Sequence, residues 1–160
     1  MSSNSILAKS GLKPKNVSVL GAKAKTRANE SKPNSAEIIR LAGEKLADGY
    51  SAEAEKILRE ALQSRTHSPD DLANLNRLLA YTLETVGRYK ESIEAIKIYE
   101  TETAVAGLTA ETRVKVLTQL AICYNNLSDY PRAVTLLKQK LTVADENNLH
   151  HLHGRIHIAL

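Results

Sequence analysis

The sequence has little of what stabilises small secreted domains or aromatic-rich cores. Its 160 residues include one cysteine, no tryptophan, no phenylalanine and six tyrosines. Because Cys123 has no second cysteine to pair with, an internal disulfide is excluded, and a reducing cytoplasm is the compartment that fits best. With aromatic residues at only 4%, the core must come from Leu, Ile, Val and Ala. Such a core favours helices over a β-sandwich.

Long hydrophobic runs and catalytic motifs are also missing. No stretch approaches the roughly 18 apolar residues of a membrane span, and the N-terminus lacks the apolar segment of a signal peptide. The sequence contains no Gly-rich phosphate loop, no cysteine pair at zinc spacing, and no HExxH or GxSxG motif. We therefore expect no membrane association, no enzymatic activity, no cofactor and no small-molecule substrate.

The basic charge of the chain is concentrated at its N-terminus. Residues 1–33 carry seven basic residues and one acidic residue, a charge of +6, whereas the remainder carries 15 basic and 17 acidic residues, a charge of −2. The segment 1–33 is rich in Ser, Lys, Asn and Gly without a helix or strand period, which predicts a disordered tail. A basic arm for nucleic acid or an acidic membrane surface, or a targeting segment, are the alternatives. The pI near 9.2 is thus no evidence for a basic face on the folded part.

From residue 34 onward the pattern is helical. Apolar residues recur at three- and four-residue spacing, and no useful strand-like alternation appears, so an all-α domain over 34–160 is predicted. Helix start and stop signals lie at Ser35, Asp48-Gly49, Ser51, Ser68-Pro69, Gly87, Gly107 and Ser128-Asp129. They divide the domain into three antiparallel helix hairpins and a last, unpartnered helix over 149–160. In the second hairpin, Ile93, Ile96 and Tyr99 are expected on one returning helix.

The three hairpins form an internal repeat. Each has a small residue midway along its first helix and another early in its second helix, with a tyrosine in the turn between them. The small residues are Ala42 and Ala54, Ala80 and Ser92, and Ala121 and Ala133. The turn tyrosines are Tyr50, Tyr89 and Tyr130. Small side chains at these places allow the two helices of a pair to approach closely, whereas larger ones would separate them.

This pattern resembles the tetratricopeptide repeat (TPR) family over about residues 35–160. Ala42 to Ala80 spans 38 residues and Ala80 to Ala121 spans 41, longer than the family's usual repeat of about 34. The repeats therefore look like the extended type of kinesin light chains and bacterial signalling proteins. Tyr99 and Lys140 stand where the family usually has a small residue. The resemblance implies an α-α superhelix, a right-handed solenoid of antiparallel hairpins.

The resemblance also implies a function and a site. Family members hold a peptide or a partner helix in a concave groove lined by the first helices of the pairs. The family's groove positions fall here on Asn74, Arg77, Tyr81, Glu84, Lys115, Thr118, Ile122, Asn125 and Asn126. Asn side chains can satisfy both the N–H and the C=O of an extended peptide, and Arg77 and Lys115 could hold an acidic group. The alternative is that these are ordinary solvated residues.

Two other functions stay open at this level. One is a regulatory region at the N-terminal side of a larger signalling protein, suggested by a helical pattern that continues to Leu160. The other, weaker hypothesis is nucleic-acid binding through the basic tail.

The histidines and the cysteine are candidates for chemical sites. His150, His153 and His157 recur at i, i+3 and i+7 and could chelate a transition metal. Because the pattern includes no nearby Cys or acidic ligand, no metal site is predicted. The three histidines are expected to be ordinary, partly exposed helix residues. Cys123 stands beside Ala121 in a core-facing stretch, so it is predicted to be buried and inert.

Overall fold

The computed structural model describes residues 33–64 and 66–155, which form one helical unit. Its elements are α1 (Ser35–Ala47), α2 (Ser51–Leu62), α3 (Pro69–Thr85), α4 (Tyr89–Ile96), the 3-10 helix η1 (Lys97–Glu100), α5 (Glu102–Ala106), α6 (Ala110–Asn126), α7 (Tyr130–Glu146) and the 3-10 helix η2 (His150–Arg155). The described residues contain no strand, which confirms the all-α class. None of their helices has the length and apolar character needed to cross a membrane. The predicted tail lies outside the described residues except for Pro33.

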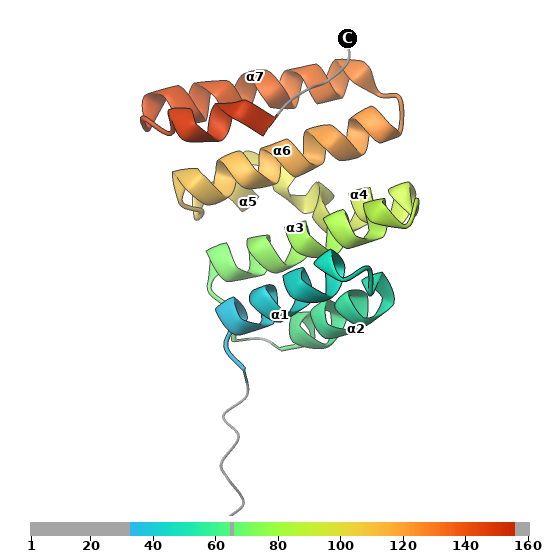
Figure 1. Cartoon of the computed structure of the whole chain (residues 1–160). Coiled ribbons are helices and arrows are strands. Elements are labelled where there is room, and N and C mark those ends of the chain that lie inside the picture. The colour runs from blue at the N-terminus through green and yellow to red at the C-terminus, as the bar shows by residue number, and fades with distance from the viewer. Residues whose placement is uncertain (1–32, 65, 156–160) are drawn as a thin grey trace, which may run out of the picture. The chain divides into compact units, whose positions relative to one another are not determined.

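The helices are arranged as stacked pairs. α1 packs on α2, α3 on α4, and α6 on α7. The first helices also touch one another in sequence, because α3 contacts both α1 and α6 (Figure 1). The three first helices therefore lie next to one another through the unit, with α3 between the other two.

Four helices end with the same backbone turn. The turn residue has a positive φ in each case, at Gly49 (83°), Gly87 (76°), Ser128 (62°) and Asn148 (57°). The next N–H then donates to a carbonyl five residues earlier. These bonds are Tyr50 to Lys45 (2.8 Å), Arg88 to Leu83 (2.9 Å), Asp129 to Tyr124 (2.9 Å) and Leu149 to Ala144 (2.8 Å). This pattern is a Schellman motif, and it turns the chain sharply after α1, α3, α6 and α7.

Polar side chains cap the starts of α1, α3, α5, α6 and α7, with one correction to the sequence prediction. Asn34, rather than Ser35, caps α1, because its Oδ1 accepts the Glu37 N–H at 2.9 Å. The Ser35 hydroxyl instead hydrogen-bonds Nδ1 of His67 at 2.9 Å, just before α3. The side chain of Ser35 therefore ties two successive hairpins together rather than capping its own helix.

The start of α3 is tied to the start of α6 in a similar way. The Asp70 carboxylate accepts hydrogen bonds from the N–H of Thr109 at 3.1 Å and from its hydroxyl at 2.7 Å. Hydrogen bonds from Thr112 and Thr109 hold the pKa of Asp70 below its usual value. Polar contacts thus link the beginnings of successive first helices.

The small repeat residues are buried, as their positions predicted. Their exposed fraction is at most 1% at Ala42, Ala54, Ala80, Ser92, Ala121 and Ala133. In the second hairpin the contact is direct, because the Ser92 hydroxyl donates to the Ala80 carbonyl at 2.7 Å. Only a small side chain on α4 can bring a hydroxyl this close to the backbone of α3.

The second hairpin differs from the single returning helix that the sequence predicted. α4 ends at Ile96, and the chain continues as η1 and α5. Thr101 marks the break, since its hydroxyl donates to the Ile98 carbonyl and caps the N–H of Ala104. The β-branched residues here have low helix propensity, and a threonine cap favours a new helix start. Tyr99 is buried at the break and accepts a hydrogen bond from Asn76 of α3 at 3.2 Å.

The predicted C-terminal helix is also different in the structure. Residues 150–155 form the 3-10 helix η2 rather than an α-helix, and residues 156–160 lie outside the described residues. The turn at Asn148 ends α7 shortly before this segment, and a glycine at position 154 lowers the helix propensity of the segment. A short 3-10 segment is the common outcome next to a helix end.

Replacing Ala121 with Leu tests the close packing of the repeat residues. Ala121 has no exposed surface, so the added atoms must displace their neighbours, and we expect the free energy of unfolding to fall by about 1–3 kcal/mol. Urea unfolding followed by circular dichroism measures this change. Ala52→Leu, at an exposed position of α2, is the matched control and should change stability by less than about 0.5 kcal/mol. Equal stability of the two variants would contradict the packing described.

A substitution in the turn after α6 should instead increase the free energy of unfolding. Ser128 holds a left-handed conformation that glycine adopts without strain, so Ser128→Gly should raise the free energy of unfolding by about 1 kcal/mol. Gly87→Ala should lower it by a similar amount. Nothing lies within 4 Å of the added Cβ at Gly87, so only the backbone conformation is penalised. A destabilised Ser128→Gly protein would show that the serine side chain is needed there.

Candidate functional site

The nine predicted groove residues lie on the first helices α3 and α6. We call them the first-helix stripe: Asn74, Arg77, Tyr81 and Glu84 on α3, and Lys115, Thr118, Ile122, Asn125 and Asn126 on α6. None of the nine is buried, and Tyr81 is 44% exposed. Their spacing of three and four residues places each set along one face of its helix.

The stripe borders α1 through a small hollow. This hollow, of about 270 Å³, is lined from α3 by Leu78, Tyr81 and Thr85. From the first hairpin it is lined by Gly43, Leu46, Ala47 and Ser51. The sequence prediction assigned no binding residue to α1. The repeat could have indicated Gly43 as a binding residue. Gly43 follows Ala42 in the first hairpin, just as the stripe residue Tyr81 follows Ala80 in the second.

A buried glutamine connects the stripe of α3 to α6. Gln119 Nε2 donates to Glu84 Oε2 at 2.7 Å, and Gln119 itself is buried. The Glu84 carboxylate is therefore already engaged within the fold. The sequence analysis missed Gln119, because nothing in the spacing of residues along α6 distinguishes it from the exposed polar residues of that helix.

Several stripe residues use their polar groups on their own helix. Asn74 donates to the Asp70 carbonyl at 2.9 Å, and the Thr118 hydroxyl donates to the Val114 carbonyl at 2.7 Å. Lys115 forms an ion pair with Glu111 at 2.6 Å, and this hydrogen bond lowers the pKa of Glu111. Arg77 also interacts within the chain. These four side chains have partners that a ligand would have to displace or share.

The remaining stripe residues keep their side chains available. Tyr81, Asn125 and Asn126 make no side-chain hydrogen bond to any residue within 33–64 and 66–155, and Ile122 is partly exposed. Two neighbouring amides offer both donors and acceptors to a ligand. A phenol ring adds a large contact area at small entropic cost. The stripe thus has an available subset of four residues.

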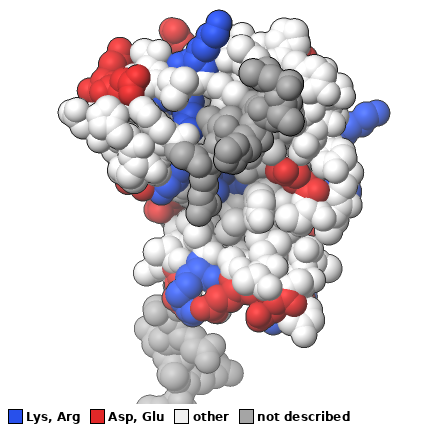
Figure 2. Space-filling model, turned by 45° about the horizontal axis from the view of Figure 1, so that its top comes forward, with Lys and Arg blue, Asp and Glu red and all other residues white. Residues whose placement is uncertain are grey.

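Charge on the surface is mixed in sign. On the face drawn in Figure 2, acidic and basic side chains lie beside one another instead of gathering into a patch of one sign. Ion pairs also bring opposite charges together, since Arg88 pairs with Glu55 at 2.7 Å and with Glu91 at 2.5 Å. A nucleic-acid-binding face requires a basic stripe, which this view of the folded unit does not display.

A larger hollow lies away from the stripe, beside the start of α1 and the end of α2. It has a volume of about 1030 Å³ and includes Ser35, Ile38 and His67 in its lining. The His67 ring hydrogen-bonds Ser35 through Nδ1 and donates from Nε2 to the Ala61 carbonyl at 2.8 Å. Both ring nitrogens hold the connection between α2 and α3 in place. The sequence did not predict this hollow.

Cys123 is buried, as predicted from its position. Its exposed fraction is 1%, and its sulfur lies 3.1 Å from the Ser92 hydroxyl. Burial raises the pKa of the thiol. Since the thiolate is the reactive form, the structure favours the inert thiol that the sequence predicted.

Lys140 of α7 is an unusual core residue. It has no exposed surface, and its Nζ has no hydrogen-bond partner. Burial lowers the pKa of its amine. Among the three hairpins, Lys140 stands where the first has Ala61 and the second has Tyr99. Lys140 therefore destabilises the third hairpin when its amine is charged.

Replacing Lys140 with Met should stabilise the protein by about 1–3 kcal/mol at neutral pH, because a buried amine without a partner is costly. The folded state binds this proton less readily than the unfolded state, so stability rises with pH between the two pKa values. The gain from Lys140→Met should accordingly shrink as pH approaches the ordinary lysine pKa of 10.5. Urea unfolding at several pH values checks this, with exposed Lys138→Met as the control. A gain that does not vary with pH would contradict a charge effect.

Two of the three candidate histidines lie in η2, shortly after the end of α7. His150 and His153 come close to Asp145 there, a carboxylate that the sequence pattern did not place beside them. His157 lies outside the described residues. Among those residues, no other group of three His, Cys, Asp or Glu side chains meets in a way that could hold a metal ion.

In comparisons with known proteins, no family model matches the sequence, and no curated protein matches it either. The function of the chain is therefore inferred from the stripe and its surroundings.

Proposed function

We propose that this chain is a non-enzymatic TPR-like adaptor that binds a peptide or a partner helix along the exposed faces of α1, α3 and α6. The observation that carries the proposal is the side-by-side placement of these three first helices, with the stripe partly exposed along two of them. The buried small residues at each pair and the repeated turns support the extended TPR type. A right-handed superhelix with a concave face is part of the proposal.

The chemistry along the surface indicates what such a ligand must offer. At the α1 end, Ile39, Gly43 and Leu46 are partly exposed and apolar, which suits an apolar side chain. At the α6 end, Asn125 and Asn126 present amides that suit the N–H and C=O groups of an extended backbone. The ligand is therefore a peptide with an apolar residue placed a few residues from a segment recognised through its main chain. A reducing cytoplasm is the setting that we propose.

The test is a peptide selected for binding to the full chain from a random library displayed on phage. In our proposal the Tyr81→Ala and Asn125→Ala variants each bind that peptide at least about tenfold more weakly, since an aromatic anchor and a paired amide are typical hot-spot contacts. Isothermal titration calorimetry with the synthetic peptide gives the affinities.

A matched control separates binding from folding. Tyr130→Ala removes an exposed tyrosine from α7 rather than from a first helix, and it should leave the affinity unchanged. All three variants should keep the wild-type melting temperature within a few degrees, because they change exposed or partly exposed side chains. If the peptide binds both stripe variants as tightly as it binds the control, the binding site lies elsewhere and the proposal is wrong.

A further inference from the structure

The end of α7 brings three potential metal ligands together through local backbone geometry. The positive φ of Asn148 reverses the chain after α7, and the Leu149 N–H closes the turn on the Ala144 carbonyl. η2 then begins at His150. A 3-10 helix has three residues per turn, so side chains at i and i+3 eclipse one another. His150 and His153 therefore project from the same side of η2, next to the last turn of α7.

The distances fit ligand atoms that share one ion. Asp145 Oδ1 lies 3.1 Å from His153 Nε2 and 3.7 Å from His150 Nδ1. All three ligand atoms lie within 4.8 Å of one another. In a tetrahedral zinc site with bonds of about 2.0–2.2 Å, the ligand atoms lie about 3.3–3.6 Å apart. The exposed side chains of Asp145 and His150, at 61% and 65%, can close the remaining difference by small rotations.

The hydrogen bonding of His153 adds a second observation at the same atoms. Its Nε2 is buried and has no hydrogen-bond partner, although the Asp145 oxygen lies 3.1 Å away. The two atoms are therefore near each other without the alignment of a hydrogen bond. Buried polar atoms in folded proteins are normally paired. A cation between an imidazole nitrogen and a carboxylate oxygen would satisfy both atoms at once.

We propose that Asp145, His150 and His153 form a binding site for one divalent transition-metal ion of the zinc class, with solvent completing its coordination. Two imidazoles and one carboxylate, with water in the fourth position, are an established ligand set for zinc in proteins. The ion joins η2 to the last turn of α7. Its binding thereby fixes η2 against α7.

The test is a titration of the untagged full chain with zinc chloride, in competition with a chromogenic chelator. We expect one zinc ion per chain in this competition. The His153→Ala and Asp145→Asn variants should each bind zinc at least about tenfold more weakly, because tenfold losses occur even when only a supporting group of a metal ligand is removed. Zinc should also raise the melting temperature of the wild-type protein, since it binds the folded state.

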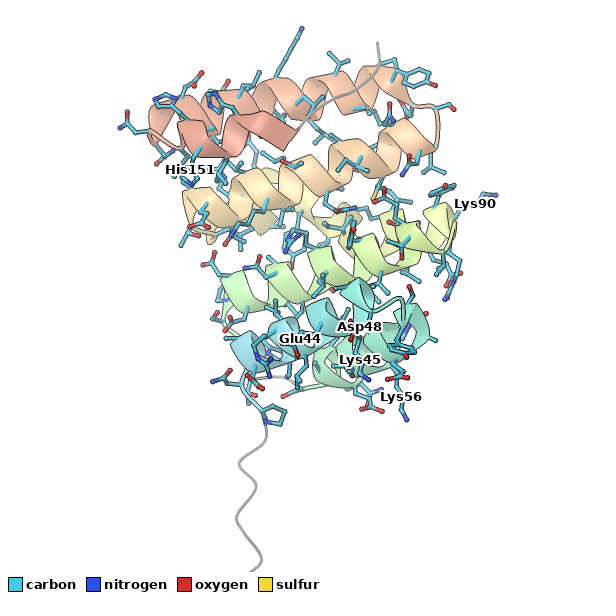
Figure 3. All side chains as sticks on the ribbon, in the orientation of Figure 1. Glu44, Lys45, Asp48, Lys56, Lys90 and His151 are labelled. Carbon is cyan, nitrogen blue, oxygen red and sulfur yellow. The ribbon has the colours of Figure 1, made fainter. Side chains whose placement is uncertain are left out.

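His151→Ala is the matched control. His151 lies between the two proposed ligands in sequence and is exposed, and Figure 3 labels it beside the first turn of α6. Its electrostatic effect on Glu111 of α6 agrees with that placement. Zinc affinity and the zinc-induced rise in melting temperature should survive this change, whereas both should fall in His153→Ala. Equal losses in His151→Ala and His153→Ala would indicate diffuse binding to a histidine-rich surface. That result, or no zinc binding by the wild-type chain, overturns the proposal.

Discussion

Close contact between small side chains at the helix pairs is the constraint on which the structure depends. The Ser92 hydroxyl reaches the Ala80 carbonyl of the facing helix, and the equivalent alanines of the other two pairs have almost no exposed surface. Interiors at this packing density leave no room for a larger side chain without displacement of a helix. The inner faces of the two helices in each pair are therefore buried against each other. What remains exposed on α3 and α6 includes the stripe, so the packing decides which residues can meet a ligand.

Repeated turns and hydrogen bonds between hairpins place each helix pair beside the next in a similar way. Residues with positive φ end all three first helices with the same hydrogen-bond pattern, so each second helix starts in a similar direction. Ser35 with His67, and Asp70 with Thr109, then join the starts of neighbouring hairpins. Each such contact is worth only about 1 kcal/mol. Their value lies in placing successive first helices beside one another, which the proposed binding surface requires.

The repeat is least regular where a large residue occupies a small-residue position. Tyr99 is buried beside the break that divides the second hairpin into α4, η1 and α5. Lys140 brings a buried amine without a partner into the third hairpin. The third hairpin is also the one after which η2 lies, with its two histidines near Asp145. The C-terminal part of the unit therefore combines a weakened core with a potential metal ligand set, and an ion there would offset part of that weakness.

The sequence by itself determined the features that depend on a few neighbouring residues. These include the helical class, most helix ends, the turns at Gly49 and Gly87, and the burial of the small repeat residues, because capping, turn conformation and amphipathic spacing act over one or two helical turns. The N-cap at Ser35 was wrong only by one residue, since Asn34 offers an equally good cap. The break after α4 and the short η2 were missed, because the apolar spacing continues across both places, whereas the Thr101 cap and a glycine at position 154 favour an interruption.

Only the tertiary structure decided which residues from different elements meet. It paired Glu84 with Gln119, which removes one predicted stripe residue from the available set. It also left the amides of Asn125 and Asn126 without partners among the described residues and brought Asp145 to the histidines of η2. Periodicity places a residue on a face of its own helix. It cannot say which side chain of another helix will face it, because that depends on how the helices pack.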